Sequence, residues 1–185
     1  MLRRHGKAGE KGSHAEVVDL GVSIDVGAPL PYLLADGQRA AVVFHAGLTP
    51  DAGWDGSTVT VVDPAAEVER NLGWVIFDGV YQVSLGPPNE EALAGHPLYG
   101  AGLEYMSAHE VRNSALVAEY ERRNRVHPHH KPERFDSLTH VIITFHDETL
   151  ECLCRSWKAG ALTADFDSAI EAAASALRTG EMESK

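Results

Sequence analysis

The chain has 185 residues, of which 44% are hydrophobic, and its 27 acidic and 16 basic side chains give a formal net charge of −11. A chain of this length corresponds to about one domain and can fill a hydrophobic core. The acidic balance argues against nucleic acid or an anionic membrane as a partner, because both attract basic surfaces. No apolar run approaches the ~20 residues of a membrane-spanning helix.

The beginning of the chain is polar and has no apolar segment of the kind that a secretory signal needs. We therefore expect residues 1–14 to be a disordered leader and residues 15–180 to form a single α+β domain. One residue separates Cys152 from Cys154, so on a strand they point to the same face at or beyond the distance that a disulfide allows. Reduced thiols and the polar leader together indicate a cytoplasmic protein.

Short runs of β-branched and apolar residues, separated by turn sequences, predict strands in the first half of the chain. These runs cover residues 15–26, 39–46, 57–63 and 73–85. Asp36-Gly37 supplies a turn between the first two runs, and Asp78-Gly79 interrupts the last. The frequent turns favour an antiparallel meander over alternating strand–helix–strand units.

The middle of the chain carries two helix signals. Asn89 can cap a short helix over residues 90–93. Residues 114–125 have apolar side chains at helical spacing, and Asn113 or Ser114 can cap the start of this second helix. Arginines near its end suit the negative pole of the helix dipole. Both segments are therefore predicted to be helical.

A third helix is predicted near the C-terminus. Asp165 or Asp167 can cap its start, an apolar stripe follows, and Gly180 is typical of the position just past a helix end. Together these elements predict an α+β fold: an antiparallel sheet, built from a meander and a hairpin in the second half of the chain, with two or three packed helices.

Residues 139–155 are expected to form that hairpin. A two-residue turn at Asp147-Glu148 would place Ile143 opposite Cys152 and Thr144 opposite Glu151, and a four-residue loop would keep the same faces. One face then holds apolar or thiol side chains: Val141, Ile143, Phe145, Leu150, Cys152 and Cys154. The other face is mainly polar and holds His140, Thr144, His146, Thr149, Glu151 and Arg155, with Ile142 and Leu153 among them.

The polar face carries the candidate active site. It would put His146 within reach of Glu151, and a neighbouring carboxylate can tune an imidazole for proton transfer near neutral pH. We expect His146 to be the catalytic acid or base, Glu151 its orienting carboxylate, and His96 or His127 a contribution from an adjoining loop. The side chains expected to bind substrate are Thr144, Asp147, His140 and Arg155.

Other chemical motifs are weak in this sequence. His127, His129 and His130 suggest a metal-binding loop, but the chain has neither an HExxH motif nor paired CxxC motifs, so we expect no metal site. It also has no glycine-rich phosphate-binding loop and no GxSxG nucleophile turn. We therefore expect catalysis without a cofactor.

Five motifs carry a resemblance to a known family. They are Gly86-Pro87-Pro88-Asn89, Gly95-His96-Pro97-Leu98, Asn124-Arg125-Val126-His127-Pro128, Pro132-Glu133-Arg134-Phe135 and the run TFHDETLEC over residues 144–152. Together they resemble a family of bacterial hypothetical proteins, whose last motif has a form close to FTFHDSTFEC. This chain departs from that form at Ile143, Glu148 and Leu150. The resemblance implies that the segments around His96, His127 and His146 belong to one arrangement, and it implies no particular chemistry.

These observations favour a small cytosolic enzyme that acts on a small polar molecule by general acid–base catalysis. The polar face could instead be an ordinary solvated sheet surface. In that case the protein would bind a small molecule without catalysis, or would be a homodimeric interaction protein that uses the same loops. A metal-binding protein built on the histidine loop is the third possibility.

Overall fold

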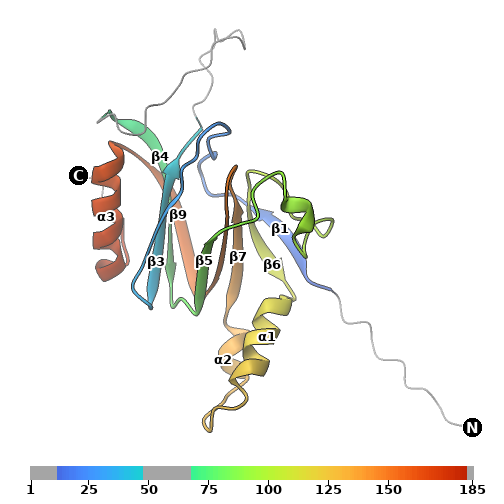
Figure 1. The fold of residues 1–185 in the computed structure, drawn as a ribbon. Coiled ribbons are helices and arrows are strands. Elements are labelled where there is room, and N and C mark those ends of the chain that lie inside the picture. Colours follow the sequence, from blue (N-terminus) through green and yellow to red (C-terminus); the bar gives the residue numbers. More distant parts are fainter. Residues whose placement is uncertain (1–11, 48–67, 183–185) are drawn as a thin grey trace, which may run out of the picture.

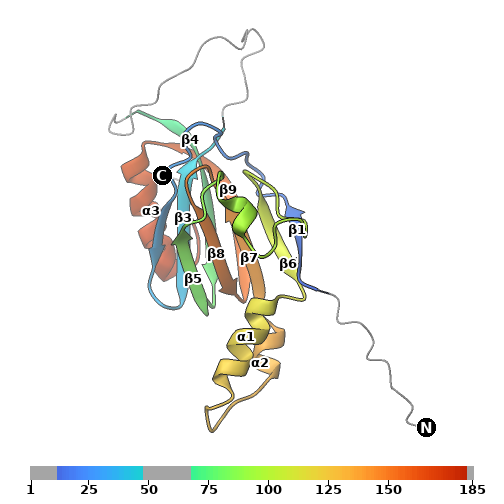
Figure 2. The same cartoon turned by 45° about the vertical axis from the view of Figure 1, so that its right-hand side comes forward.

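The computed structural model describes residues 12–47 and 68–182, which form two antiparallel sheets packed face to face with helices outside them (Figures 1 and 2). The strands described in one sheet follow the order β1-β6-β7-β8-β5, and those in the other follow β2-β3-β4-β9. This arrangement confirms the expected α+β class with antiparallel strands. The strands divide between two sheets instead of extending one.

The first sheet consists of β1 (His14–Val18), β5 (Gln82–Gly86), β6 (Ala108–Arg112), β7 (Thr139–Thr144) and β8 (Thr149–Cys154). The second consists of β2 (Tyr32–Ala35), β3 (Arg39–His45), β4 (Arg70–Asp78) and β9 (Ser156–Ala164). The helices in this part of the chain are the short 3₁₀ helix η1 (Leu93–Gly95), α1 (Ala115–Asn124), α2 (Glu133–Asp136) and α3 (Phe166–Thr179). Among the described residues, no helix has the length and apolar character needed to cross a bilayer.

The main hydrophobic core lies between the two sheets. Phe44 of β3 and Phe145, which follows β7, meet there with ring centroids 5.3 Å apart. The apolar face predicted for the hairpin is confirmed, because every member is buried in this core: Val141, Ile143, Phe145, Leu150, Cys152 and Cys154. Both cysteines are free thiols.

Helix α3 covers the outer face of the four-stranded sheet, as Figure 1 shows. Three alanines on one side of the helix, Ala169, Ala173 and Ala176, pack against apolar residues of β3 and β4. The predicted boundaries are confirmed. The Asp165 carboxylate accepts a hydrogen bond from the Ser168 amide at 2.8 Å, and Gly180 has the left-handed conformation (φ 77°) that ends the helix.

A loop with one short helix covers the outer face of the five-stranded sheet. The Asn89 side chain accepts a hydrogen bond from the Ala92 amide, and the turn it begins leads into η1. Three leucines of this segment then pack against Ile142 of β7 in a separate cluster: Leu93, Leu98 and Leu103. The face that the sequence predicts to be polar is therefore covered by chain, and its apolar members are buried.

The register of the β7–β8 hairpin differs from the one that a two-residue turn at Asp147-Glu148 would give. In the structure Thr144 lies opposite Thr149 and Ile142 lies opposite Glu151, so residues 145–148 form a four-residue turn. The turn is closed by a hydrogen bond of 2.8 Å from the Phe145 amide to the Glu148 carbonyl. The shift of two residues keeps every side chain on its face but gives each a new partner across the hairpin.

Thr144 is predicted on the open polar face, and the structure corrects this. Its side chain is only 1% exposed. The hydroxyl donates to the Glu104 carbonyl at 2.8 Å and accepts from the Ser107 amide at 3.1 Å. Thr144 therefore holds the loop before β6 against the sheet and is buried away from solvent.

Other boundaries also change. The sequence does not predict two of the strands, β9 with nine residues and β6 with five. β1 begins at His14, which pairs with Arg112, so the fold starts inside the predicted leader 1–14. The predicted strand at 57–63 lies outside the described residues.

Capping of α3 can be tested with two neighbouring aspartates. Asp165→Ala should lower the free energy of unfolding at both low and high salt, because the Ser168 amide loses its acceptor. Asp167→Ala removes a charge of the first turn but no cap, so its smaller effect should disappear at high salt, where the helix dipole is screened. Urea unfolding at low and high salt measures both. Equal losses for the two variants at high salt would contradict the assignment of the cap.

The role of Thr144 can be tested by separating its hydroxyl from its methyl group. Thr144→Val keeps the shape but leaves the Glu104 carbonyl and the Ser107 amide unpaired, which should cost about 1–3 kcal/mol. Thr144→Ser keeps the hydroxyl and loses one methyl group, worth about 0.8 kcal/mol. Thermal unfolding should therefore show the lower melting temperature for Thr144→Val. The reverse order would show that packing, and not the hydrogen bonds, dominates at this position.

Candidate functional site

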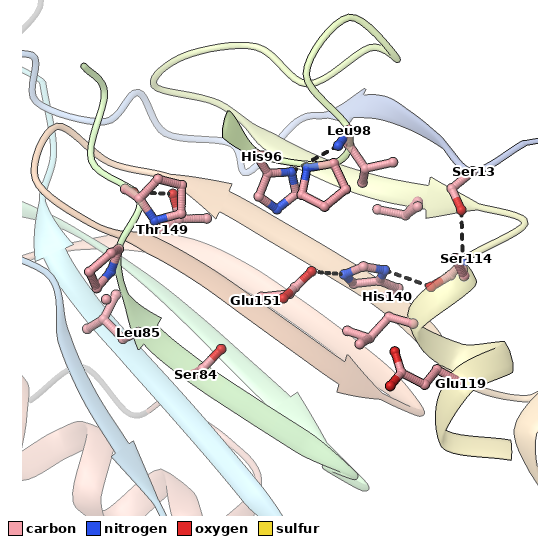
Figure 3. Close-up of a pocket in the computed structure, with 17 residues that line it drawn as sticks. Ser13, Ser84, Leu85, His96, Leu98, Ser114, Glu119, His140, Thr149 and Glu151 are labelled. Carbon is pink, nitrogen blue, oxygen red and sulfur yellow. Dashed lines mark hydrogen bonds and ion pairs between the residues drawn. The ribbon is translucent and has the colours of Figure 1, made fainter. Parts of the chain in front are cut away.

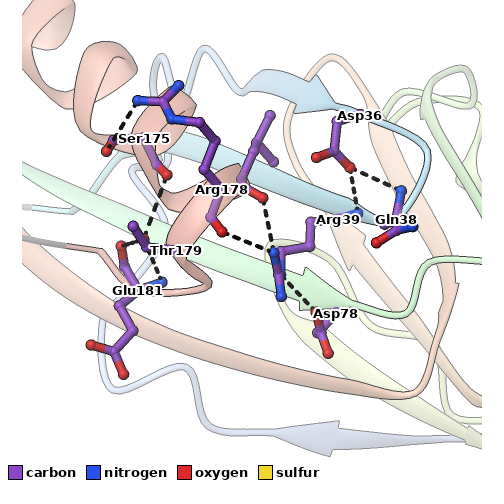
Figure 4. A network of polar contacts seen from close by, with 9 residues as sticks. Asp36, Gln38, Arg39, Asp78, Ser175, Arg178, Thr179 and Glu181 are labelled. Atoms are coloured by element: carbon purple, nitrogen blue, oxygen red, sulfur yellow. Dashed lines mark hydrogen bonds and ion pairs between the residues drawn. The ribbon is translucent and has the colours of Figure 1, made fainter.

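A cavity of about 740 Å³ opens on the outer face of the five-stranded sheet (Figure 3). Its floor is formed by side chains of β7 and β8, and its rim by the segment that follows β5, the segment after η1 and the start of α1. The polar side chains that line it include His96, Ser114, His140, Thr149 and Glu151. Two histidines and a carboxylate therefore meet in one cavity.

The buried ring of His140 joins two other residues of the cavity. Its Nε2 lies 2.9 Å from a carboxylate oxygen of Glu151, and its Nδ1 lies 2.8 Å from the hydroxyl of Ser114. An ionised carboxylate can only accept, so Nε2 carries the proton and Nδ1 accepts from the serine hydroxyl. The result is a continuous chain of hydrogen bonds from Ser114 through His140 to Glu151, which Figure 3 shows along the floor of the cavity.

Local structure explains how these three residues come together. His140, Ile142 and Glu151 share the outer face of the hairpin, and Glu151 lies one diagonal step from His140 across the two strands. Ser114 is the N-cap of α1, and its hydroxyl accepts from the Val117 amide at 3.1 Å. The cap predicted for this helix thus also points a hydroxyl at the sheet.

Glu151 is the charged member of this chain of hydrogen bonds. The hydrogen bond from His140 holds the pKa of the Glu151 carboxyl below its usual range, although partial burial acts in the opposite direction. The carboxyl group is therefore ionised at neutral pH. Its side chain is 28% exposed, so the charge remains accessible from the cavity while His140, at 3%, does not reach bulk solvent.

His96 lies across the cavity from Glu151 (Figure 3). Its Nδ1 accepts a hydrogen bond from the Leu98 amide at 3.2 Å, so the neutral ring carries its proton on Nε2. Burial lowers the pKa of His96, and the attraction of Glu151 only partly offsets this effect. His96 is therefore a neutral ring with a free N–H donor for a molecule bound in the cavity.

The remaining wall of the cavity is mainly apolar. Leu85, Pro87, Pro88 and Pro97 form part of it. Glu119 also lies at the rim, but its carboxylate is paired with Arg123 on the same helix. The lining residues, all within the described part of the chain, include neither lysine nor arginine. Such a cavity suits a small molecule that is neutral or positively charged and has an apolar portion.

The expected pairing of His146 with Glu151 is wrong, because Glu151 pairs with His140. His146 lies in the hairpin turn, and its Nδ1 is 2.9 Å from the carboxylate of Asp147. This contact raises the pKa of His146, and its side chain is 47% exposed. Neither His146 nor Asp147 lines the cavity. The backbone carbonyl of His146 accepts from the Glu90 amide, which connects the turn to the segment before His96.

His127 also does not line the cavity. It lies in the loop after α1, at the opposite end of the sheet from η1, as Figures 1 and 2 show together. In this loop His130 contacts Glu121 at 2.9 Å and Asn124 at 3.0 Å. Across residues 12–47 and 68–182, no group of three or more histidines, cysteines or acids is placed to hold a metal ion. His130 of this loop therefore contacts residues of α1, and the loop does not line the cavity.

Of the four expected substrate-binding residues, the cavity includes His140 alone. Arg155 follows β8 and donates to the Ser137 hydroxyl at 2.8 Å, outside the cavity. Ser114 was identified only as a helix cap, and its contact with His140 spans 26 residues of sequence. The one signal that could have indicated a covered site was Ile142 and Leu153 among polar neighbours, because such residues need a partner to bury them.

Comparisons of the chain with protein-family models, curated proteins and solved structures give no significant match. The resemblance in the five motifs therefore remains a prediction. The function has to be argued from the residues of the cavity themselves.

Protonation of His96 should reduce stability in mild acid. Because burial holds the folded pKa below the 6.5 of an unfolded histidine, the unfolded chain binds the proton more readily. This contribution of His96 to the free energy of unfolding is fully present above about pH 6.5. It is lost as the pH falls toward the pKa of His96 in the folded protein. His96→Gln keeps an acceptor for the Leu98 amide and removes the titration.

Urea unfolding between about pH 7.5 and pH 5.5 should therefore show a smaller loss of unfolding free energy in His96→Gln than in the unmodified protein. His45 and His109, whose pKa values are also lowered by burial, are present in both proteins and cancel in the comparison. Identical pH dependences would show that His96 does not titrate differently on folding.

Proposed function

We propose that the protein is an enzyme that acts on a small polar molecule by general acid–base catalysis in the cavity of His96, His140 and Glu151. His140 is the acid and base, because its Nδ1 can take a proton from the Ser114 side of the chain and return it. Glu151 holds the ring in one tautomer and stabilises the imidazolium that forms. The carboxylate thus keeps its expected role, with His140 in the place proposed for His146.

His96 is suited to a different part of the reaction. A neutral imidazole with a free Nε2–H can donate a hydrogen bond to an oxygen atom on which negative charge develops. The ionised Glu151 carboxylate, on the opposite side of the cavity, stabilises positive charge on a bound molecule. The two sides therefore favour opposite charges, and a polar bond between them would be polarised.

One observation supports the proposal above all: the Ser114–His140–Glu151 chain ends in a cavity that could hold a small molecule. Any buried histidine needs hydrogen-bond partners, but both partners of His140 line the cavity, and one of them is a carboxylate that is 28% exposed. A protein that binds its ligand without converting it remains the alternative, and the cavity would serve both.

The proposal predicts a large loss of turnover in Glu151→Gln. A panel of small polar esters, amides and carbonyl compounds would be incubated with the protein and followed by proton NMR. For any compound converted, Glu151→Gln should lower the rate by about 10²–10⁴-fold, because the amide can still hydrogen-bond His140 but cannot stabilise its charge. His146→Gln, at the exposed hairpin turn, is the matched control and should retain the rate.

Melting temperatures of both variants are measured alongside, so that lost turnover is compared only between folded proteins. Compounds that raise the melting temperature but are never converted would favour the binding alternative. A loss of turnover in His146→Gln equal to that in Glu151→Gln would place the reaction at the hairpin turn and contradict the proposal.

A further inference from the structure

Four hydroxyl side chains line the described wall of the cavity: Ser13, Ser84, Ser114 and Thr149. Three of them contact backbone or amide groups. Ser13 donates to the Asn113 carbonyl, Thr149 donates to the Pro88 carbonyl, and Ser84 accepts from Gln82. Ser114 alone among them contacts an imidazole. Its environment therefore differs from that of the other hydroxyls in a way that changes its chemistry.

The contact with His140 provides a base that can accept the proton of the Ser114 hydroxyl. A serine hydroxyl is a weak nucleophile until an adjacent base takes its proton as the new bond forms. His140 is such a base, and the Glu151 carboxylate on its other nitrogen stabilises the resulting positive charge. The order serine–histidine–carboxylate is that of serine hydrolases, with the two ring nitrogens exchanged.

The surroundings of the Ser114 oxygen also favour negative charge. The Val117 amide donates to this oxygen, and the residue lies at the positive end of the ten-residue helix α1. The Nε2–H of His96 is available elsewhere in the same cavity as a donor to the oxygen of a bound carbonyl group. A hydroxyl, a base and an oxyanion donor thus line one cavity.

We infer that Ser114 is a catalytic nucleophile and that the cavity transfers an acyl group from a small ester to water. This inference rests on the acid–base function proposed for His140 and Glu151 and names the reaction that they serve. It assigns Ser114 a chemical role in addition to its structural role as the cap of α1.

The reaction proceeds in two balanced halves. Ser114 Oγ forms a bond to the acyl carbon while its proton passes to Nδ1 of His140. The bond from that carbon to the alcohol oxygen breaks, and the departing alkoxide takes the proton. Water then attacks the acyl carbon, gives a proton to His140, and the carbon–Oγ bond breaks, so that Ser114 recovers its proton and a carboxylic acid is released.

The residues that line the cavity restrict which ester can bind there. Among the lining residues, all described, Glu151 contributes charge to the cavity and no lysine or arginine is present to bind an anionic group. The proline and leucine side chains favour an apolar acyl or alcohol portion. The expected substrate is a small ester that is neutral or carries an amine.

Diisopropyl fluorophosphate tests the nucleophile directly. An activated serine forms a bond to its phosphorus and releases fluoride, and peptide mass spectrometry locates the adduct. The full chain should be labelled at Ser114, and labelling should be at least about 10²-fold slower in Glu151→Gln. Ser114→Asn keeps a capping side chain for α1 but has no hydroxyl, so it should fold and give no adduct at this position.

Ser137→Ala is the matched control, because Ser137 is another serine at a helix end whose hydroxyl contacts a charged side chain, Arg155, in place of a histidine. It should be labelled at Ser114 at the normal rate. A folded protein that gives no Ser114 adduct, while a known serine hydrolase is labelled in the same buffer, overturns the inference.

The inference and the acid–base proposal can fail separately. Turnover that survives in Ser114→Asn and is lost in Glu151→Gln would remove the covalent step and leave acid–base catalysis in place. Labelling that is as fast in Glu151→Gln as in the unmodified protein would instead show that the chain through His140 does not activate Ser114, and would also overturn the inference.

Discussion

Burial of the β7–β8 hairpin on both of its faces is the constraint that shapes the rest of the molecule. One face closes the core between the sheets, and the other lies under the η1 segment and α1. A polar side chain on a strand covered in this way must find a hydrogen-bond partner, because leaving it unpaired costs about 1–3 kcal/mol. The outer face carries several such side chains, and three of them, Thr144, Thr149 and His140, each bond to a different part of the covering chain.

These bonds position the covering segments. Thr144 holds the loop before β6, Thr149 holds the Pro88 carbonyl, and His140 holds the start of α1 through Ser114. The cavity remains between the points of attachment. The side chains proposed for catalysis are therefore among those that hold the covering segments in place. The effect of a variant on turnover can be interpreted only if the replacement side chain keeps the hydrogen bond of the original residue.

The charges of the cavity follow from the same burial. Glu151 remains ionised because His140 donates to it, and His96 remains neutral because the surrounding chain excludes water. Neither state could be assigned from residue type, since the exposed His146 is shifted in the opposite direction by Asp147. Position in the fold, and not the kind of residue, decides which histidine stays neutral.

The sequence by itself determined the features that depend on near neighbours. Alternation along residues 139–155 identified the core face, and local patterns narrowed each helix cap to two candidates, of which the structure selects Ser114 and Asp165. Both features involve only a few consecutive residues. The tertiary structure alone decided which carboxylate meets which histidine. A two-residue shift in the hairpin leaves the alternation unchanged, so the alternation cannot choose between registers. In the structure the outer face of the hairpin packs, through Ile142, against the segment around η1, which lies some fifty residues away in the sequence.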